Sequence, residues 1–256
     1  MADSSPWLTV VTVVKDDLPG MRGTLESLAD QDLDGVQYVV IDSSGNPSEI
    51  PEILPEALRS DYAWTEPRGI YPAMNTGLEL STGTYLYFAN AGDRLMPGVL
   101  ARVRAALIPA EPMWAFGGVD FVVPGHDEPA AEPSWEYSVE IRHFLARRRF
   151  PPHQGVFMQA AELRRQGGFD EGYRITADYL SVLRAGRIAP PVVLSETIAR
   201  FTTGGASTTH WREALREFHR ARLEALDLRG PGRLHEGWHT AGTWARTAVY
   251  RGLLDR

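Results

Sequence analysis

The stretch Leu8-Thr9-Val10-Val11-Thr12-Val13-Val14 is a short apolar run rich in β-branched residues, and it predicts a strand buried on both faces. Apolar residues then recur at helical spacing over Leu18–Leu28, and Val36–Ile41 is a second apolar strand. The turn-forming residues 42–47 (Asp-Ser-Ser-Gly-Asn-Pro) close that strand. Strand, helix and strand in this order predict a βαβ unit, and therefore a parallel sheet with right-handed crossovers.

The same alternation continues through the first half of the chain, and the second half is mixed. The helices that we expect are Ile50–Leu58, Tyr71–Leu80, Pro97–Leu107, Tyr137–Arg149, Ala160–Gln166, Ala177–Ala185, Thr208–Leu228 and Thr240–Leu254. The further strands are Thr84–Ala89, one or two within Trp114–Val123, Gly155–Gln159 and Val192–Arg200. We expect one α/β domain over residues 1–207, with a helical C-terminal extension (208–256) packed on it.

Composition excludes several classes of protein. A chain of 256 residues with 43% hydrophobic residues can bury a substantial core. No apolar run approaches the roughly 20 residues that cross a bilayer, and the N-terminus lacks the basic and apolar parts of a signal peptide. The absence of cysteine excludes disulfides and thiolate sites, and the net charge of −7 argues against nucleic acid as a partner. We expect a cytoplasmic protein.

Polar residues gather at the ends of three expected strands, as Lys15-Asp16-Asp17, Asp42-Ser43-Ser44 and Asn90-Ala91-Gly92-Asp93. In an open α/β sheet, ligands bind beyond the carboxyl ends of the strands, so these turns would line one edge. The chain has neither a G-x-G-x-x-G turn after the first strand nor a G-x-x-x-x-G-K-[ST] loop. Dinucleotide-binding and P-loop sites therefore lack their phosphate cradle.

Two neighbouring segments resemble glycosyltransferase family 2. They are Arg68-Gly69-Ile70-Tyr71-Pro72-Ala73-Met74-Asn75-Thr76-Gly77 and Ser81–Asp93, which ends in Asn90-Ala91-Gly92-Asp93. They are similar to the branch of that family with G-I-Y-x-A-M-N and N-x-G-D motifs. Later markers of the same resemblance are His153-Gln154, Gly167–Glu171, Ala177-Asp178-Tyr179 and Gly204–Ser207. The ordered combination is specific, although each piece alone is not.

The resemblance implies a GT-A fold, which is Rossmann-like with a mostly parallel central sheet flanked by helices, here with helical C-terminal additions. It also implies a nucleotide-diphosphate sugar, such as a UDP-sugar, as donor, and transfer to an acceptor hydroxyl with inversion. The acceptor would be a glycan, a lipid-linked molecule or a small molecule, in glycan, polysaccharide or glycosylated-metabolite biosynthesis. By family position, donor-binding residues are Thr12, Val14, Asp42, Ser43, Arg68, Tyr71, Asn75, Asn90 and Ala91. The acceptor or diphosphate region would hold His153, Gln154, Gly205 and Ser207.

A divalent metal usually accompanies this family. Asn90-Ala91-Gly92-Asp93 stands where the family has its D-x-D motif, and Asp93 is its single remaining carboxylate. One carboxylate, two diphosphate oxygens and waters suffice for Mg²⁺, and Mn²⁺ accepts a similar set. His210 is a further candidate ligand, because some GT-A enzymes recruit a late histidine, although a lone histidine is more often structural or exposed.

Asp178 is the candidate catalytic residue. Ala177-Asp178 stands in the place of the family's E-D pair, whose second acid is the general base of inverting enzymes. A positioned carboxylate that takes the acceptor's proton contributes typically about 10²–10⁴-fold to the rate. From the residues alone, structural interpretations stay open. Asp178 can complement a helix dipole, Asp42 can cap a turn, and Tyr71 can belong to a core stripe.

Two functional classes follow. The first is an active transferase, and the second is a non-catalytic GT-A-like domain that binds a nucleotide or a partner. The last expected helix, Thr240–Leu254, also leaves two interpretations open. It could rest as a peripheral element on the inner face of a membrane and meet a lipid-linked acceptor. We favour the other interpretation, in which it packs on the core or on another subunit of a homo-oligomer.

Overall fold

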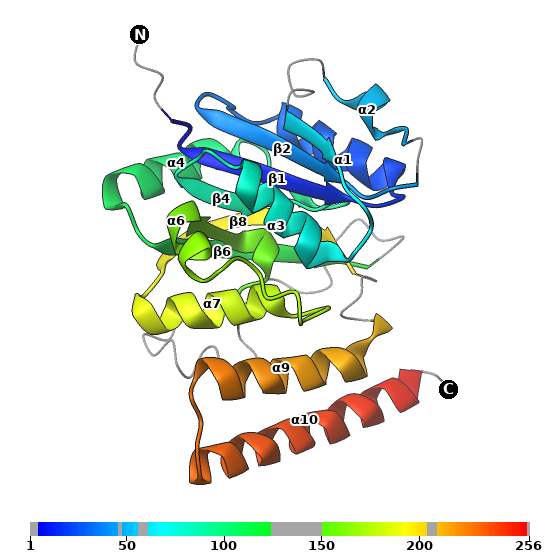
Figure 1. The fold of residues 1–256 in the computed structure, drawn as a ribbon, viewed down its shortest axis with the longest axis vertical. Helices are drawn as coiled ribbons and strands as arrows, with labels where there is room; N and C mark the ends of the chain where they lie inside the picture. The colour runs from blue at the N-terminus through cyan, green and yellow to red at the C-terminus, as the bar shows by residue number, and fades with distance from the viewer. Residues whose placement is uncertain (1–4, 46–47, 56–60, 124–149, 204–208, 255–256) are drawn as a thin grey trace.

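The computed structural model describes residues 5–45, 48–55, 61–123, 150–203 and 209–254. Within these residues, eight strands form one curled sheet in the order β3-β2-β1-β4-β7-β6-β8-β5 (Figure 1). The strands are β1 (Leu8–Val14), β2 (Val36–Asp42), β3 (Tyr62–Trp64), β4 (Tyr85–Phe88), β5 (Arg94–Leu95), β6 (Trp114–Val122), β7 (Val156–Gln159) and β8 (Val192–Thr202).

The sheet is parallel in its first half and mixed in its second. Strand β1 pairs in parallel with β2 and β4, and β2 pairs in parallel with β3. Strand β7 runs antiparallel to both β4 and β6, β8 runs parallel to β6, and β5 runs antiparallel to β8. The predicted βαβ unit is therefore confirmed, and the first strand is buried along its whole length.

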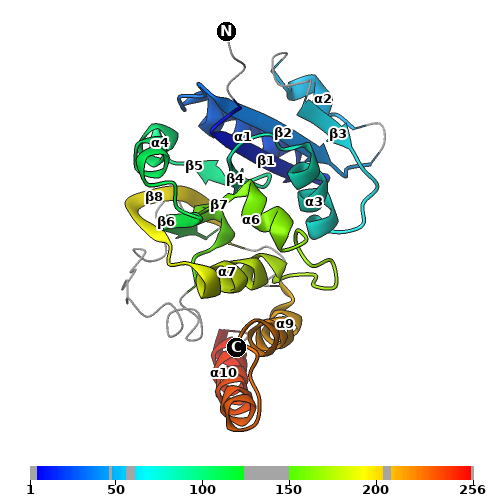
Figure 2. The same cartoon turned by 60° about the vertical axis from the view of Figure 1, so that its left-hand side comes forward.

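Helices cover both faces of the sheet (Figures 1 and 2). They are α1 (Leu18–Ala29), α2 (Ile50–Ile53), α3 (Ile70–Leu80), α4 (Val99–Ala110), α6 (Ala160–Arg165), α7 (Ala177–Ile188), α9 (Trp211–Ala225) and α10 (Pro231–Leu254), with a 3₁₀ turn, η2, at His153–Gly155. Alternate side chains of β1 enter two cores. Val11 and Val13 pack with α3, α6 and α7, whereas Val10 and Val14 pack with α1 and α4.

Helix α3 lies unusually close to the central strand. A Cβ atom built on Gly77 would stand 2.4 Å from Cγ1 of Val11, so only glycine allows this approach. The helix begins after Gly69, whose φ of 127° lies in the region that favours glycine. Close packing on β1 places the start of α3 beside the carboxyl ends of the parallel strands.

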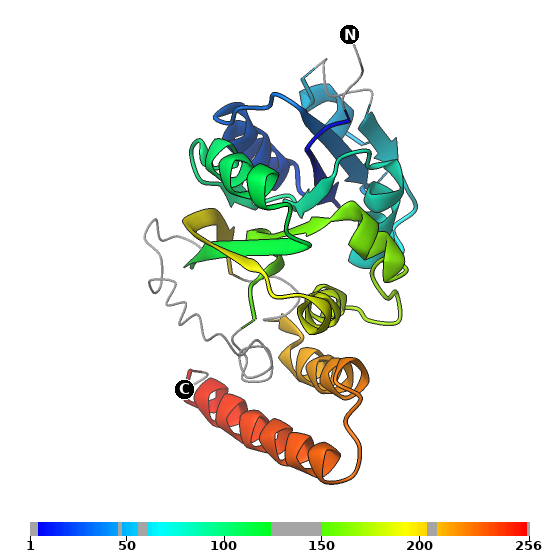
Figure 3. The same cartoon turned by 90° about the vertical axis from the view of Figure 1, so that its left-hand side faces the viewer.

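The C-terminal helices lie in layers away from the sheet. Figures 1 and 3 show α7, then α9, then α10 at increasing distance from it. Helix α10 begins at Pro231, earlier than the expected Thr240, because proline is well tolerated at the first helical position. Among the described residues, none of the helices combines the length and apolarity needed to cross a membrane.

Some expectations differ from the structure. Strands β3 and β5 span three and two residues and were not expected from the sequence. Helix α2 ends at Ile53, where the sequence predicted a helix to Leu58. The helix expected at residues 137–149 and the loop expected at 124–133 lie outside the described residues.

Candidate active site

The three polar turns meet at the carboxyl edge of the parallel strands. The backbone N–H of Asp16 donates to Oγ of Ser44 at 2.8 Å, and the N–H of Gly45 donates to Oδ1 of Asp16 at 2.9 Å. The N–H of Ala91 donates to the carbonyl of Val13 at 3.1 Å. Residues that follow β1, β2 and β4 thus lie side by side, as the sequence predicted.

Two of the predicted donor residues lie at the end of β1. The carbonyl of Val14 accepts a hydrogen bond from the N–H of Ser43 at 2.8 Å, which joins the ends of β1 and β2. Thr12 is buried within β1 and accepts a hydrogen bond from the hydroxyl of Tyr38 at 2.9 Å. Val14 therefore reaches the edge of the sheet, whereas the side chain of Thr12 is engaged inside the core.

Asp42 ends β2 as a fully buried carboxylate. Its Oδ1 accepts from the N–H of Ser44 at 2.8 Å, and its Oδ2 accepts from the hydroxyl of Tyr62 at 2.8 Å. The hydroxyl of Ser43 is paired with that of Thr65 at 3.0 Å. Strand β3 and the turn after it therefore help to hold the end of β2 in place.

Asp93 sits in a tight turn after β4. Gly92 has a φ of 95°, which lets the chain fold back so that Oδ2 of Asp93 accepts the N–H of Asn90 at 2.9 Å. The side chain of Asp93 is buried, and burial raises its pKa to about 6, against the opposing charge of His153. Gln154 approaches the other oxygen, with Nε2 at 3.4 Å from Oδ1.

His153 connects Asp178 with the Asn90–Asp93 turn. Its Nδ1 lies 3.1 Å from Oδ2 of Asp178, and its Nε2 lies 3.0 Å from Nδ2 of Asn90 and 4.0 Å from Oδ2 of Asp93. Burial lowers the pKa of His153, but the hydrogen bond and charge of Asp178 outweigh burial and raise that pKa above its usual value. The structure therefore brings together residues from η2, from the start of α7 and from the turn after β4.

Asp178 is held in its ionised form. Burial raises its pKa, but hydrogen bonds from His153, from the N–H of Tyr179 and from Tyr71 lower the pKa below the ordinary aspartate value. The hydroxyl of Tyr71 donates to Oδ1 at 2.9 Å, and the pKa of Tyr71 is raised well above its usual value by burial and by this neighbouring charge. The side chains of Asp178 and His153 are each 20% exposed, so a ligand can reach them.

Asn75 and Arg68, two predicted donor-binding residues, make no described contact with His153, Asp178 or Asp93. The amide of Asn75 holds the loop before α7, since its Nδ2 donates to the carbonyl of Phe169 at 2.9 Å and its Oδ1 accepts that residue's N–H at 2.8 Å. Gly168 lies against this amide with a φ of 78°, and a Cβ there would stand 2.6 Å from Oδ1. Arg68 is exposed, immediately before the start of α3.

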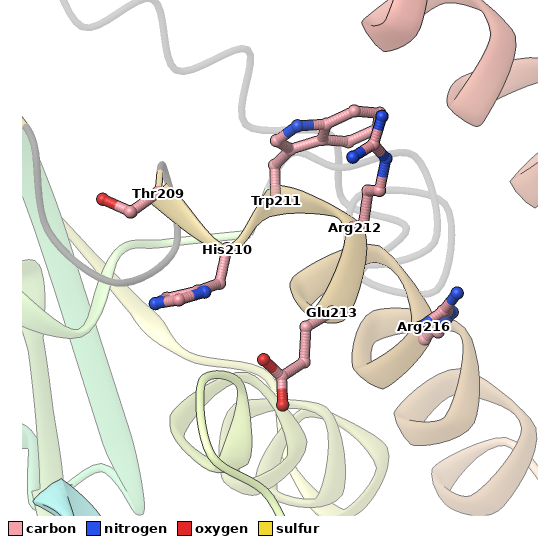
Figure 4. Close-up of a pocket in the computed structure, with 6 residues that line it drawn as sticks. All are labelled: Thr209, His210, Trp211, Arg212, Glu213 and Arg216. Atoms are coloured by element: carbon pink, nitrogen blue, oxygen red, sulfur yellow. The ribbon is translucent and has the colours of Figure 1, made fainter.

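His210 lies apart from this cluster in the contacts that the structure describes. It is exposed directly before α9 and lines a pocket of about 340 Å³ with Trp211, Arg212 and Glu213 (Figure 4). Within the described ranges, no group of three His, Asp or Glu side chains is arranged to hold a metal ion. Gly205 and Ser207 lie outside those ranges. The metal role of His210 stays a prediction.

The turn after β4 nevertheless offers two oxygens of the kind that a hard cation prefers. Oδ1 of Asn90 is buried, and no donor among the described residues reaches it, because the amide directs its Nδ2 toward His153. The carboxylate of Asp93 belongs to the same turn. An amide oxygen and a carboxylate fit Mg²⁺ or Mn²⁺, with diphosphate oxygens and waters completing the coordination.

Glu217 is a residue that the sequence did not single out. From α9, its carboxylate accepts the backbone N–H groups of Arg174, Ile175 and Thr176 at 2.8, 2.9 and 3.0 Å. These three residues directly precede α7, whose second residue is Asp178. Glu217 therefore fixes the segment from which Asp178 projects. A glutamate on a charged amphipathic helix carries no pattern that distinguishes this role.

Comparisons with known proteins give a consistent picture. Residues 9–171 match the family described as Glycosyl transferase family 2. An uncharacterized glycosyltransferase of Mycobacterium tuberculosis is 30% identical over 255 residues, which are 97% of this chain and 92% of that protein. A PGL/p-HBAD biosynthesis glycosyltransferase of Mycobacterium bovis is 26% identical over 181 residues, 69% of this chain and 68% of that protein.

The fold is shared with solved structures. S. aureus TarS 1–349 in complex with UDP-GlcNAc has a TM-score of 0.65 at 19% identity, over 90% of this chain and 69% of that chain. The mannosyltransferase PcManGT from Pyrobaculum calidifontis, in complex with GDP-Man and Mn²⁺, has a TM-score of 0.64 at 18% identity, over 98% of this chain and 74% of that chain. These likenesses confirm the expected GT-A fold with C-terminal helices.

Proposed function

The chain belongs to glycosyltransferase family 2, and from this premise we propose that it moves a sugar from a nucleotide-diphosphate sugar to an acceptor hydroxyl, with inversion at the sugar carbon. The similar folds of TarS and PcManGT, which bind UDP-GlcNAc and GDP-Man, support the class of donor. The acceptor is a glycan, a lipid-linked molecule or a small molecule, and the product belongs to glycan, polysaccharide or glycosylated-metabolite biosynthesis.

The observation that carries this proposal is the ionised Asp178 beside the turn after β4. It starts α7, is reachable from solvent, and is joined through His153 to Asn90 and Asp93. In this arrangement the ring of His153 contacts the carboxylate of Asp178 on one side and the Asn90–Asp93 turn, which carries the proposed cation ligands, on the other. An inverting transfer needs such a pair, because the proton acceptor and the leaving group act on opposite sides of the sugar carbon.

The chemical step follows from this arrangement. The acceptor hydroxyl gives its proton to a carboxylate oxygen of Asp178 while the acceptor oxygen forms a bond to the anomeric carbon. The bond from that carbon to the diphosphate oxygen breaks, and the nucleoside diphosphate leaves with the electron pair. Because attack and departure occur on opposite faces, the configuration at the anomeric carbon inverts.

The donor would lie along the carboxyl edge of the sheet. Asp42 ends β2 at this edge, with Val14 and Ser43 beside it, and is the proposed contact for the nucleobase; because its carboxylate is buried and bonded to Ser44 and Tyr62, the nucleobase would have to displace the Tyr62 hydroxyl. Arg68 is exposed at the start of α3 and offers a guanidinium for diphosphate oxygens. Asn90 and Asp93 would hold a divalent cation, which supplies positive charge for the departing diphosphate. Tyr71 orients the proposed general base, Asp178, by donating a hydrogen bond to its Oδ1.

Replacement of the proposed base provides the test. Nucleotide sugars are first screened for hydrolysis and transfer, and the active donor is used for the Asp178→Asn variant. We expect turnover to fall by at least about 10²-fold, because the amide cannot accept the proton. Stabilisation of the protein against heat by the nucleoside diphosphate with Mn²⁺ should persist, because the donor edge is untouched.

Tyr71→Phe is the matched control. It removes one hydrogen bond to Asp178 but keeps the carboxylate, so it should reduce turnover much less than Asp178→Asn. Unchanged turnover in Asp178→Asn would overturn the assignment of the base. If no nucleotide stabilises the wild-type chain and no nucleotide sugar turns over, the non-catalytic alternative replaces the transferase.

A further inference from the structure

Helix α10 exposes two of its large apolar side chains, Leu234 and Trp238, on the side that faces away from the protein. Trp238 is 83% exposed and Leu234 is 71% exposed, whereas the other exposed large hydrophobic side chains in the described residues reach at most 51%, at Ile188. Ala241, Ala245 and Ala248 are exposed as well. Relative to Leu234 these residues stand at i+4, i+7, i+11 and i+14, which places all five on one stripe of the helix.

The opposite side of α10 packs on α9 through polar contacts and through one aromatic contact, Trp244 with Trp211, whose ring centroids lie 5.2 Å apart. Oε1 of Glu236 accepts hydrogen bonds from Nε of Arg222 at 2.6 Å and from Oγ1 of Thr240 at 3.0 Å. Nη2 of Arg222 also donates to Oγ1 of Thr240 at 3.1 Å, and Thr243 is 2% exposed on the same side. An amphipathic helix in water normally turns its large apolar side chains inward, and the exposed Leu234 and Trp238 depart from that arrangement.

Such an outward apolar stripe marks a surface that something covers. Figures 1 and 3 show α10 as the outermost helix of the stack, on the side of α9 that lies away from the sheet. Its outer side is therefore open to a large, flat partner.

The charges of α10 indicate what kind of partner fits. Arg233 precedes Leu234 and Arg246 follows Ala245, so at 3.6 residues per turn the two arginines flank the stripe on its two sides. Both are exposed. Glu236 is the only acidic residue in the sequence of this helix, and it is bonded to Arg222 on the buried side. The outer side thus combines tryptophan, leucine and alanine with positive charge.

We propose that this outer side of α10, the stripe Leu234–Ala248 with Arg233 and Arg246, docks on an anionic membrane surface. A helix that lies in the headgroup region has tryptophan and leucine on its apolar side, flanked by basic residues. Anionic lipids attract those basic residues. A second copy of the chain fits less well, because its α10 would offer no free carboxylate to these arginines: Glu236 is the one acidic residue of the helix and is bonded to Arg222 on the inner side. The proposal does not depend on the donor, the acceptor or the catalytic residues.

The test is sedimentation of the full chain with vesicles. Vesicles made from an equal mixture of phosphatidylglycerol and phosphatidylcholine should bind the wild-type protein, and pure phosphatidylcholine vesicles should bind it far less. Leu234→Gln combined with Trp238→Gln should weaken binding at least about ten-fold, since each side chain loses its apolar burial. Ile108→Gln, a change of the same kind on α4 where Ile108 is 46% exposed, should leave binding unchanged.

The charge is tested separately. Arg233→Gln combined with Arg246→Gln should weaken binding to the mixed vesicles by about five-fold for each arginine removed. All of these substitutions fall on exposed side chains, and thermal unfolding verifies that each variant is folded. Equal binding to both vesicle types, or unchanged binding by the Leu234–Trp238 variant, would overturn the proposal. A wild-type dimer that this variant converts to a monomer, without vesicle binding, would assign the surface to a second copy instead.

Discussion

His153 engages both of its ring nitrogens, and this determines where its proton lies. Nε2 faces Nδ2 of Asn90, a donor, so in the neutral ring Nε2 accepts and Nδ1 carries the proton toward Asp178. The same orientation of the Asn90 amide leaves its Oδ1 without a donor among the described residues. In the neutral ring this tautomer accounts for the contact with Asp178 and for the free oxygen beside Asp93; the protonated ring donates from both nitrogens, and the amide of Asn90 must then turn its Oδ1 toward Nε2.

The contact between Asp178 and His153 should make stability depend on pH in a defined window. The pKa of Asp178 is lowered in the folded state, so its contribution is present above the unfolded value of about 3.9 and is lost as pH falls through the folded pKa. The pKa of His153 is raised, so its contribution is complete below about 6.5 and is lost as pH rises through the folded pKa. The pair is therefore most stabilising between about pH 4 and 6.5.

We expect the Asp178→Asn variant to lose more unfolding free energy, relative to wild type, at about pH 6 than at about pH 9. Urea unfolding of both metal-free proteins at these two values measures the difference. Both proteins carry Asp93→Asn in this comparison, because the pKa of Asp93 depends on the charge of His153 and its contribution would not cancel. A deficit of equal size at both values would show that the charge of His153 does not contribute.

The sequence predicts the role of a single residue only where that residue belongs to a recognisable motif. Asp42, Asp93 and Asp178 follow from the resemblance, and the structure places Asp93 and Asp178 on either side of His153. The contacts themselves could not be predicted, because they depend on how η2, α7 and the turn after β4 pack in three dimensions. Asn75 illustrates the same gap: its motif indicates a donor contact, whereas its amide is bonded to the backbone of Phe169.

At the scale of elements, strong periodicity predicted β1, α1, β2, α3 and α7, and short strands were missed. Strand β3 has three residues and β5 has two, so neither carries a pattern of its own. Each exists because a distant partner offers its edge, β2 in one case and β8 in the other. Local sequence does not contain that information.

Helix α9 provides the prediction at this scale. Glu217→Ala should remove the acceptor for three backbone N–H groups just before α7; the bond from Thr176 is buried, and those from Arg174 and Ile175 are partly buried. We expect a loss of about 2–5 kcal/mol of unfolding free energy, because buried donors are left unpaired. Turnover should also fall while the affinity for the nucleoside diphosphate is retained, since Glu217 acts through the position of Asp178 and does not touch the donor edge.

Two variants separate this positioning role from a general effect of charge. Glu213→Ala, on the same helix, removes an exposed ion pair with Arg174 and should cost at most about 1 kcal/mol, without a change in turnover. Glu217→Gln keeps one acceptor oxygen and should restore part of the stability and turnover. Urea unfolding and steady-state kinetics measure both effects. Normal turnover in a folded Glu217→Ala protein would contradict the role.

At the scale of the whole molecule, α9 and α10 are attached in different ways. Helix α9 packs into the main core through Phe218, whose ring lies 4.9 Å from that of Tyr179 and 5.2 Å from that of Phe150. Helix α10 is held to α9 by the polar contacts of Arg222 with Glu236 and Thr240 and by the ring contact of Trp244 with Trp211. A domain boundary at residue 207, as expected from the sequence, would therefore separate α9 from the aromatic cluster of Phe150, Tyr179 and Phe218, to which α9 contributes Phe218.

Two truncated chains test how far the folded unit extends. A chain of residues 1–228 loses α10, and water then solvates Arg222, so we expect cooperative unfolding, retained stabilisation by a nucleoside diphosphate, and loss of vesicle binding. A chain of residues 1–207 also loses Phe218 and Glu217. The partly buried Phe218 is lost together with the buried Leu215 and Ala221, and a domain is stable by only about 5–15 kcal/mol, so this chain should not fold.

Circular dichroism during heating measures both outcomes, and the nucleotide-dependent shift in melting temperature reports the donor edge. A folded 1–207 chain that binds nucleotide would make α9 an appendage and would remove the basis for the role of Glu217. An unfolded 1–228 chain would make α10 part of the core. The exposed Leu234 and Trp238 would then be side chains of a structural helix, which its polar contacts and the Trp244–Trp211 contact with α9 hold in place.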